Sequence, residues 1–211
     1  MTEPILGAHA CADAVLPVLV WRFPAPVLAI SSATIGGGIG PRSWVVNAQV
    51  PHAYSRTDLA AHVEEISRAN DCVGAGVGML TAASVDAVTT AGDTTLRAWA
   101  TVGLGLVTWA ADANDRARRW MPGTINIVAT LPVRCTEAAL VNAVMTATEA
   151  KTQALLERGI PATGTASDAV CIVCPPSGAA EPFAGPRSEV GAVLARVVHA
   201  AVAAGIPGAA R

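Results

Sequence analysis

The chain has 211 residues, of which 52% are hydrophobic and only 14% charged, and its formal net charge at pH 7 is −2. Average soluble domains carry roughly 25% charged residues, so this composition excludes a disordered chain and predicts one domain with a large apolar core. The slightly acidic charge and the 4% of aromatic residues offer neither a basic surface nor a stacking platform for nucleic acid.

Apolar, β-branched segments alternate with turn residues along most of the chain. The strands that they predict are residues 16–23, 27–30, 44–50, 72–79, 85–90, 97–109, 123–131 and 169–174. Helical spacing of apolar residues predicts helices over 57–69, 136–158 and 188–204. The charged segment 112–119 is expected to be a solvated loop. We therefore expect an α+β fold in which residues 1–211 form a single domain, with a mainly β-sheet core packed with two long helices. The pattern leaves the strand order open.

The location of the protein follows from its apolar runs, its amino terminus and its cysteines. Each apolar run is either shorter than the roughly 20 residues that span a bilayer or interrupted by proline and glycine. No basic residue precedes Arg22, whereas a secretory signal needs a positive segment before its apolar stretch. The five cysteines lie in apolar sequence, as buried reduced thiols do. These features predict a cytoplasmic protein without a membrane span.

Three patterns that resemble known binding or catalytic motifs lack the context that those motifs need. The glycines of residues 36–40 lead into a strand, and a dinucleotide fingerprint needs a helix there. Cys171 and Cys174 have the spacing of a redox or zinc pair, but residues three apart in a strand point to opposite faces. The histidines form no cluster, so no metal site is expected, and His52 after Pro51 fits a polar loop residue better than a general base.

Four polar clusters stand out in this apolar chain. Each places hydroxyls, an amide or a carboxylate beside glycine at the end of a predicted strand: residues 70–71 with 78–83, 89–93, 123–126 and 163–168. Glycine allows backbone N–H groups to turn toward a ligand, and threonine or asparagine adds neutral donors. Ordinary turns use the same residue types, so turn chemistry is the competing interpretation.

Lys151 is the chain's single lysine, on the predicted helix 136–158. Glu149 lies about 200° away around that helix, so the two must find separate partners. Asp168 follows the helix closely and is the expected partner of Lys151. Either a catalytic pair or a structural ion pair would explain this arrangement.

The order and spacing of these motifs resemble the adenosylcobinamide amidohydrolase family over residues 31–195. The resemblance rests on the polar clusters above, on residues 148–151 and 162–169, and on Ser31-Ser32, the following glycines and Asn47. It implies hydrolysis of the amide that joins the corrin f-side chain to aminopropanol in adenosylcobinamide or a cobamide. Adenosylcobyric acid would be released for corrinoid salvage and remodelling. The corrinoid, with its cobalt, would be the substrate, and no separate cofactor is implied.

Amide hydrolysis needs an activated nucleophile or water, oxyanion donors and an acid for the amine. The candidate catalytic residues are Asp168, Lys151, Glu149 and Asp71, with the carboxylates as general bases and the ammonium as charge stabiliser or proton donor. Oxyanion donors are expected among the N–H groups of residues 164–165 or 123–124. The candidate substrate-binding residues are Ser32, Asn47, Thr81, Thr90, Gly92, Thr124, Asn126, Thr163, Gly164 and Thr165, and one of the threonines could instead be the nucleophile.

Two other classes of function fit the same residues. One is a corrinoid-binding or trafficking protein that does not hydrolyse its ligand. The other is an amidase that cleaves itself to free a threonine or serine at a new amino terminus. The expected partner in the favoured interpretation is a small-molecule corrinoid, and a homodimer is compatible with so apolar a chain.

Overall fold

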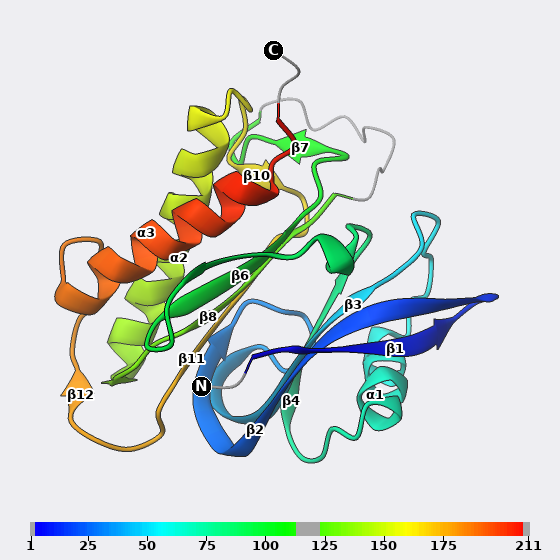
Figure 1. The fold of residues 1–211 in the computed structure, drawn as a ribbon, viewed down its shortest axis with the longest axis horizontal. Coiled ribbons are helices and arrows are strands. Elements are labelled where there is room, and N and C mark those ends of the chain that lie inside the picture. The colour runs from blue at the N-terminus through cyan, green and yellow to red at the C-terminus, as the bar shows by residue number, and fades with distance from the viewer. Residues whose placement is uncertain (1–2, 113–122, 209–211) are drawn as a thin grey trace.

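The computed structural model describes residues 3–112 and 123–208 (Figure 1). The helices are α1 (Leu59–Ala69), α2 (Glu137–Glu157) and α3 (Glu189–Gly205), with a short 3-10 helix η1 (Val85–Ala87). The strands are β1 (Ile5–Cys11), β2 (Ala14–Ser31), β3 (Gly38–Gln49), β4 (Gly76–Thr81), β5 (Thr89–Gly92), β6 (Arg97–Val102), β7 (Val107–Thr108), β8 (Ile125–Thr130), β9 (Arg134–Cys135), β10 (Gly164–Thr165), β11 (Ala169–Cys174) and β12 (Ala180–Glu181).

Within the described residues, eight strands form one mixed sheet in the order β4-β3-β2-β11-β8-β6-β5, with β1 paired to β2. The pairs β3–β4 and β8–β11 are parallel and the other neighbours are antiparallel. Two small ladders, β7–β10 and β9–β12, lie outside this sheet. None of the helices in the described ranges is both long and apolar enough to cross a membrane.

Side-chain alternation along the central strands separates two apolar layers. Ile127 of β8 belongs to a core with Leu140 of α2 and Leu194 of α3. The next residue, Val128, packs in a different core with Trp21 of β2. Because neighbouring residues of a strand point to opposite faces, one face of this half of the sheet carries the two long helices and the other faces β2, β3 and β4.

A third apolar layer lies under α1. Val20 and Val46, from β2 and β3, pack with Val63 and Ile66 of that helix. The resulting order of layers is α2 and α3, then β5-β6-β8-β11, then β2-β3-β4, then α1. Figure 1 shows α1 on the opposite side of the molecule from α2 and α3. Side chains in the layer between the two half-sheets line the cavity described below.

The structure confirms the expected α+β class and both long helices. Thr136 and Ser188 cap α2 and α3, each accepting a hydrogen bond from a backbone N–H three residues later. β11 spans the residues predicted, and within it Cys171 and Cys174 belong to different cores, as the spacing predicted.

Several details differ from the prediction. The predicted strand 85–90 is the 3-10 helix η1 followed by β5, and the predicted strand 97–109 is β6 and, in a separate ladder, β7. β2 is one strand and not two, because Pro24 and Pro26 fall in the stretch between Arg22 and Val27 where the ladder with β3 shifts register. β3 begins at Gly38, inside the expected glycine loop, and β1 was not predicted. α1 begins at Leu59, two residues later than predicted, with Asp58 as its N-cap residue, and the Asp58 side chain makes no capping hydrogen bond. Residues 113–119 of the predicted loop lie outside the described residues.

The glycines of β4 permit close approach of neighbouring groups, as their alternation predicted. The backbone of Ile35 bridges to Gly78, whose N–H donates to the Ile35 carbonyl at 3.0 Å. The indole of Trp44 covers Gly76 so closely that an added Cβ would collide with its ring atoms.

We expect Gly76→Ala to lower the free energy of unfolding by about 1–3 kcal/mol, because Trp44 must move to admit the methyl group. The matched control is Gly208→Ala, since a Cβ at Gly208 meets no atom within 4 Å. Chemical denaturation of both variants measures the difference. Equal stabilities would contradict the close packing of Trp44 on β4.

Candidate active site

A cavity of about 580 Å³ opens at one end of the layer between the two half-sheets. Its lining residues come from segments that follow β2 and β3, from β4, and from the chain around the starts of β8 and β11. They are residues 32–35, Val50, Pro51, Tyr54, Arg56, Leu59, residues 78–82, Leu106, Gly123, Thr124, Asn126 and residues 166–169. The volume is in the range of small-molecule sites, and most of the lining is apolar or neutral.

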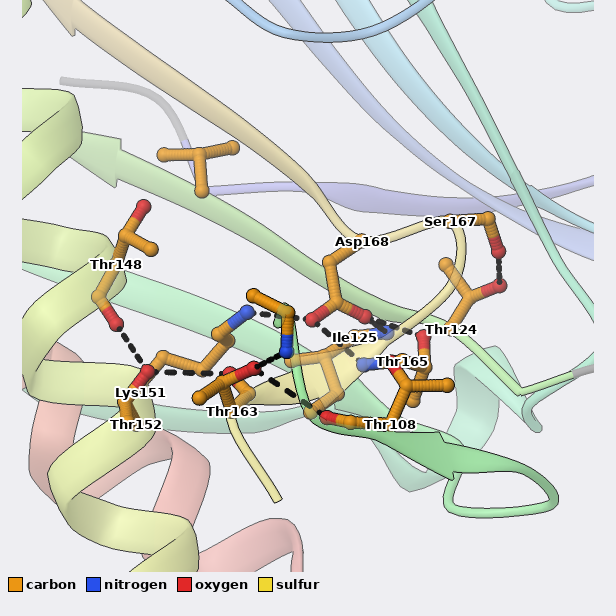
Figure 2. Close-up of polar contacts among 12 residues, drawn as sticks. Thr108, Thr124, Ile125, Thr148, Lys151, Thr152, Thr163, Thr165, Ser167 and Asp168 are labelled. Atoms are coloured by element: carbon orange, nitrogen blue, oxygen red, sulfur yellow. Dashed lines mark hydrogen bonds and ion pairs between the residues drawn. The ribbon is translucent and has the colours of Figure 1, made fainter. Parts of the chain in front are cut away.

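Asp168 lies on the cavity wall and accepts four hydrogen bonds. Its Oδ2 accepts from Lys151 Nζ at 2.5 Å and from the Thr165 N–H at 3.1 Å. Its Oδ1 accepts from the Ile125 N–H at 2.9 Å and from the Thr165 hydroxyl at 2.5 Å. Figure 2 shows these donors converging on the carboxylate from α2, from β8 and from β10. The predicted pairing of Lys151 with Asp168 is confirmed.

This arrangement changes how the neighbouring groups can act. The Thr165 N–H, expected among the oxyanion donors, already donates to Asp168. Both carboxylate oxygens accept two hydrogen bonds each, so a proton could reach Asp168 only by displacing a donor. Lys151 is 6% exposed and does not line the cavity. An added Cβ at Gly164 would collide with both Asp168 and Lys151, so glycine is required beside the ion pair.

Two hydroxyls beside this ion pair line the cavity, and their hydrogen bonds define which of them donates and which accepts. Ser167 Oγ donates to the Gly123 carbonyl at 3.2 Å, since a carbonyl can only accept. Ser167 and Thr124 share a hydrogen bond of 2.8 Å between their hydroxyl oxygens (Figure 2). Because the proton of Ser167 is used by Gly123, Thr124 is the donor of this bond. Its own oxygen keeps lone pairs for a ligand.

A buried amide network lies deeper in the cavity. Asn126 Nδ2 donates to Asn47 Oδ1 at 2.9 Å and to the Leu80 carbonyl at 3.2 Å, and Asn47 donates to Thr101 at 3.0 Å. Asn126 is 2% exposed and lines the cavity, yet its Oδ1 has no hydrogen-bond partner among the described residues. An unpaired buried acceptor is costly, so this oxygen is a candidate ligand contact.

Tyr54 and Arg56 also line the cavity, and the sequence analysis did not select them. Arg56 donates to both Asp58 and Glu65, with closest N–O distances of 2.7 Å to each. These bonds raise the pKa of Arg56, and they lower the pKa of Asp58 to about 2 and that of Glu65 below its ordinary value. Tyr54 is the only tyrosine in the chain, which was the one signal available in the sequence.

Two other predicted residues take part in the local structure of the wall. Ser32 lines the cavity and exchanges hydrogen bonds with the backbone of Val170, 3.0 Å each, joining the end of β2 to β11. Thr81 also lines the cavity, and its hydroxyl accepts from the Ala83 N–H. Together with Thr124, Asn126 and Asp168, they are the predicted site residues that the structure brings to the cavity.

The remaining predicted residues lie away from it. Asp71 follows α1, is exposed, and pairs with an arginine of β2 at 3.7 Å. Glu149 is exposed on α2. Thr90 and Gly92 belong to β5, where an added Cβ at Gly92 would collide with the backbone carbonyl of Leu96, just before β6. Thr163 stabilises the loop before β10 through Thr108 and Ala110. None of these five lines the cavity.

The fold and the cavity define an α+β protein with a small-molecule site, in which a buried ion pair supports a wall of neutral hydrogen-bonding groups. The sequence matches the family described as adenosylcobinamide amidohydrolase over residues 7–209. It is 31% identical over 184 residues to an adenosylcobinamide amidohydrolase of Methanosarcina mazei, a match that covers 83% of this chain and 88% of that protein. It is also 43% identical over 91 residues to one of Halobacterium salinarum, covering 43% of this chain and 38% of that protein.

The chain therefore belongs to the adenosylcobinamide amidohydrolase family. Membership confirms the resemblance seen in the motifs and the predicted enzyme class, an amidohydrolase.

We expect Lys151→Met to lower the free energy of unfolding by about 3 kcal/mol, because it leaves the Asp168 carboxylate buried without its counter-charge. The matched control is Arg68→Met, which breaks an exposed ion pair with Glu64 and should change stability little. Denaturant titrations compare the two variants. Similar losses in both would contradict the structural role of the buried pair.

Proposed function

We propose that this chain hydrolyses the amide between the f-side-chain propionyl group of a corrin ring and aminopropanol, in adenosylcobinamide or a complete cobamide. The amide C–N bond breaks, water supplies the hydroxyl to the carbonyl carbon, and a proton goes to the leaving amine. The products from adenosylcobinamide are adenosylcobyric acid and 1-amino-2-propanol. The corrinoid is the substrate, and the proposal includes no separate cofactor.

The observation that carries this proposal is a cavity lined mainly by apolar and neutral polar groups, with Asn126 in its wall and the buried Oδ1 of that residue unpaired among the described residues. A corrin is large and mostly apolar, and carboxamides surround its edge. Its amide N–H groups are the donors that a buried, uncharged acceptor recognises. Family membership supports the same substrate class.

We assign Asp168 and Lys151 first to shaping this site. The carboxylate fixes the loop that carries Ser167 and the start of β8, so that Thr124 and Asn126 stand at defined places on the wall. Active sites need such positioning because small displacements of reacting groups cost large factors in rate. Asp168 lines the cavity and remains the predicted general base, acting when a donor leaves one of its oxygens.

The proposal also keeps the predicted cytoplasmic location. All five cysteines are free thiols, and reduced thiols fit that compartment. The predicted homodimer and the exclusion of nucleic acid stay predictions.

The decisive experiment incubates the purified protein with adenosylcobinamide and follows adenosylcobyric acid by mass spectrometry, with a complete cobamide in parallel. We expect release of the acid and of 1-amino-2-propanol. Corrinoid that stays intact while co-eluting with the protein would instead support a binding or trafficking protein. Two chains on a denaturing gel would support the self-cleaving amidase.

We expect Asn126→Ala to raise the KM for adenosylcobinamide roughly tenfold, because the variant lacks the buried amide acceptor. The matched control on the same strand is Thr130→Val, which removes a hydroxyl that contacts only Arg97 backbone. Steady-state kinetics, with thermal unfolding to check the fold, measure both variants. Unchanged kinetics in Asn126→Ala would argue against this oxygen as a substrate contact.

A further inference from the structure

A second polar assembly borders the cavity, and neither the sequence motifs nor the proposed reaction uses it. Tyr54 lines the cavity and is half-buried. Its hydroxyl lies 2.7 Å from Nδ1 of His62, and the two rings stack with centroids 5.5 Å apart. The imidazole of His62 is fully buried on α1, and the ring of His9 lies beside it at 5.5 Å between centroids.

The contact of His9 with Gln49 defines which ring nitrogen of His9 carries the proton. His9 Nε2 lies 2.8 Å from the Gln49 carbonyl, which can only accept, so Nε2 carries the proton of His9. Nδ1 of a neutral His9 is then an acceptor, and it has no partner within the part of the chain that the structure describes. The buried Nε2 of His62, in the neighbouring ring, also has none.

The tautomer of His62 follows from the chemistry of its bond with Tyr54. A phenol O–H is a stronger donor than the N–H of a neutral imidazole, and the unprotonated ring nitrogen is a stronger acceptor than a phenol oxygen, so the favoured tautomer carries its proton on Nε2. Burial lowers the pKa of His62, which favours the neutral ring that this arrangement needs. Nδ1 is therefore an acceptor, and the Tyr54 hydroxyl is its donor.

The charged groups nearby leave Tyr54 uncharged. Burial raises the pKa of the Tyr54 hydroxyl, Arg56 lowers it, and Cys11, Asp58 and Glu65 raise it further. Arg56 is itself held by two carboxylates. The hydroxyl thus keeps its proton at neutral pH and directs it to His62.

We propose that Tyr54 is a substrate-binding residue whose hydroxyl oxygen accepts a hydrogen bond from an amide N–H of the substrate, and that His62 is the positioning residue that fixes its polarity. The identity of the substrate, a corrinoid with peripheral amides, rests on the proposed function. The polarity of Tyr54 rests on its contact with the buried His62 and on the neutral state of both groups, and is independent of the proposed function.

The experiment uses the fact that the chain has one tyrosine. Protein labelled with 3-fluorotyrosine gives a single ¹⁹F resonance that reports Tyr54, and adenosylcobinamide is added to it. In parallel, the KM and kcat for adenosylcobinamide are measured for Tyr54→Phe, His62→Asn and His62→Leu. Thr146→Val, which removes a buried hydroxyl of α2 that bonds the Ala184 carbonyl, is the control for a general loss of stability.

The expected result is a shifted resonance on addition of adenosylcobinamide and a roughly tenfold higher KM in Tyr54→Phe, with kcat changed less. His62→Asn, which keeps an acceptor for the hydroxyl, should stay nearer to the wild type than His62→Leu. Thr146→Val should have the wild-type KM, whatever its stability.

Two outcomes would overturn the inference. One is a resonance that does not move although adenosylcobinamide binds or is hydrolysed. The other is an unchanged KM in a folded Tyr54→Phe variant. A shifted resonance without any release of adenosylcobyric acid would support Tyr54 as a ligand contact and refute the proposed hydrolysis, so the two failures are distinguishable.

Discussion

One buried carboxylate holds together three parts of the chain that form an end of the cavity. The Asp168 carboxylate accepts hydrogen bonds from the Lys151 ammonium of α2 and from the Ile125 N–H at the start of β8. It also accepts from the N–H and the hydroxyl of Thr165 in β10. The charge of Lys151 makes this burial tolerable, and the missing side chain of Gly164 makes room for it. Ser167 and Thr124 stand on the wall because the loop that carries Asp168 and the start of β8 are joined there.

Three polar side chains of the cavity wall donate their protons to groups of the protein that lie behind them. The amide of Asn126 donates to Asn47 and Leu80, the hydroxyl of Thr124 donates to Ser167, and that of Tyr54 donates to His62. In each case the protons are used inside the protein; the hydroxyl oxygens of Thr124 and Tyr54 keep lone pairs beside the cavity, and Oδ1 of Asn126 is unpaired but buried. A wall of this kind favours a ligand rich in N–H donors, and it does so without a buried net charge.

The sequence predicted correctly those features of the fold and the site that depend on local patterns. Apolar spacing located α2 and α3, and the short stretch of chain from Lys151 to Asp168 made the pairing of these two residues predictable. Asn126 and Asn47 were selected by motif, but their contact depends on how β3 and β8 face each other across the core. Tyr54 was missed because its partner His62 carries no motif. Asp71 and Glu149 were selected for their charge, which does not determine whether a residue is buried or exposed.

The place of β11 in the sheet also constrains when the protein can fold. This strand is the last of the main sheet in chain order, yet it lies between β2 and β8 and pairs with both. During synthesis, the edge of β2 that pairs with β11 therefore stays unpaired until most of the chain has left the ribosome. Such non-local pairing makes folding slow and leaves apolar strand edges open to other chains. Production of this protein should therefore benefit from slow translation and from chaperones that shield the edge of β2.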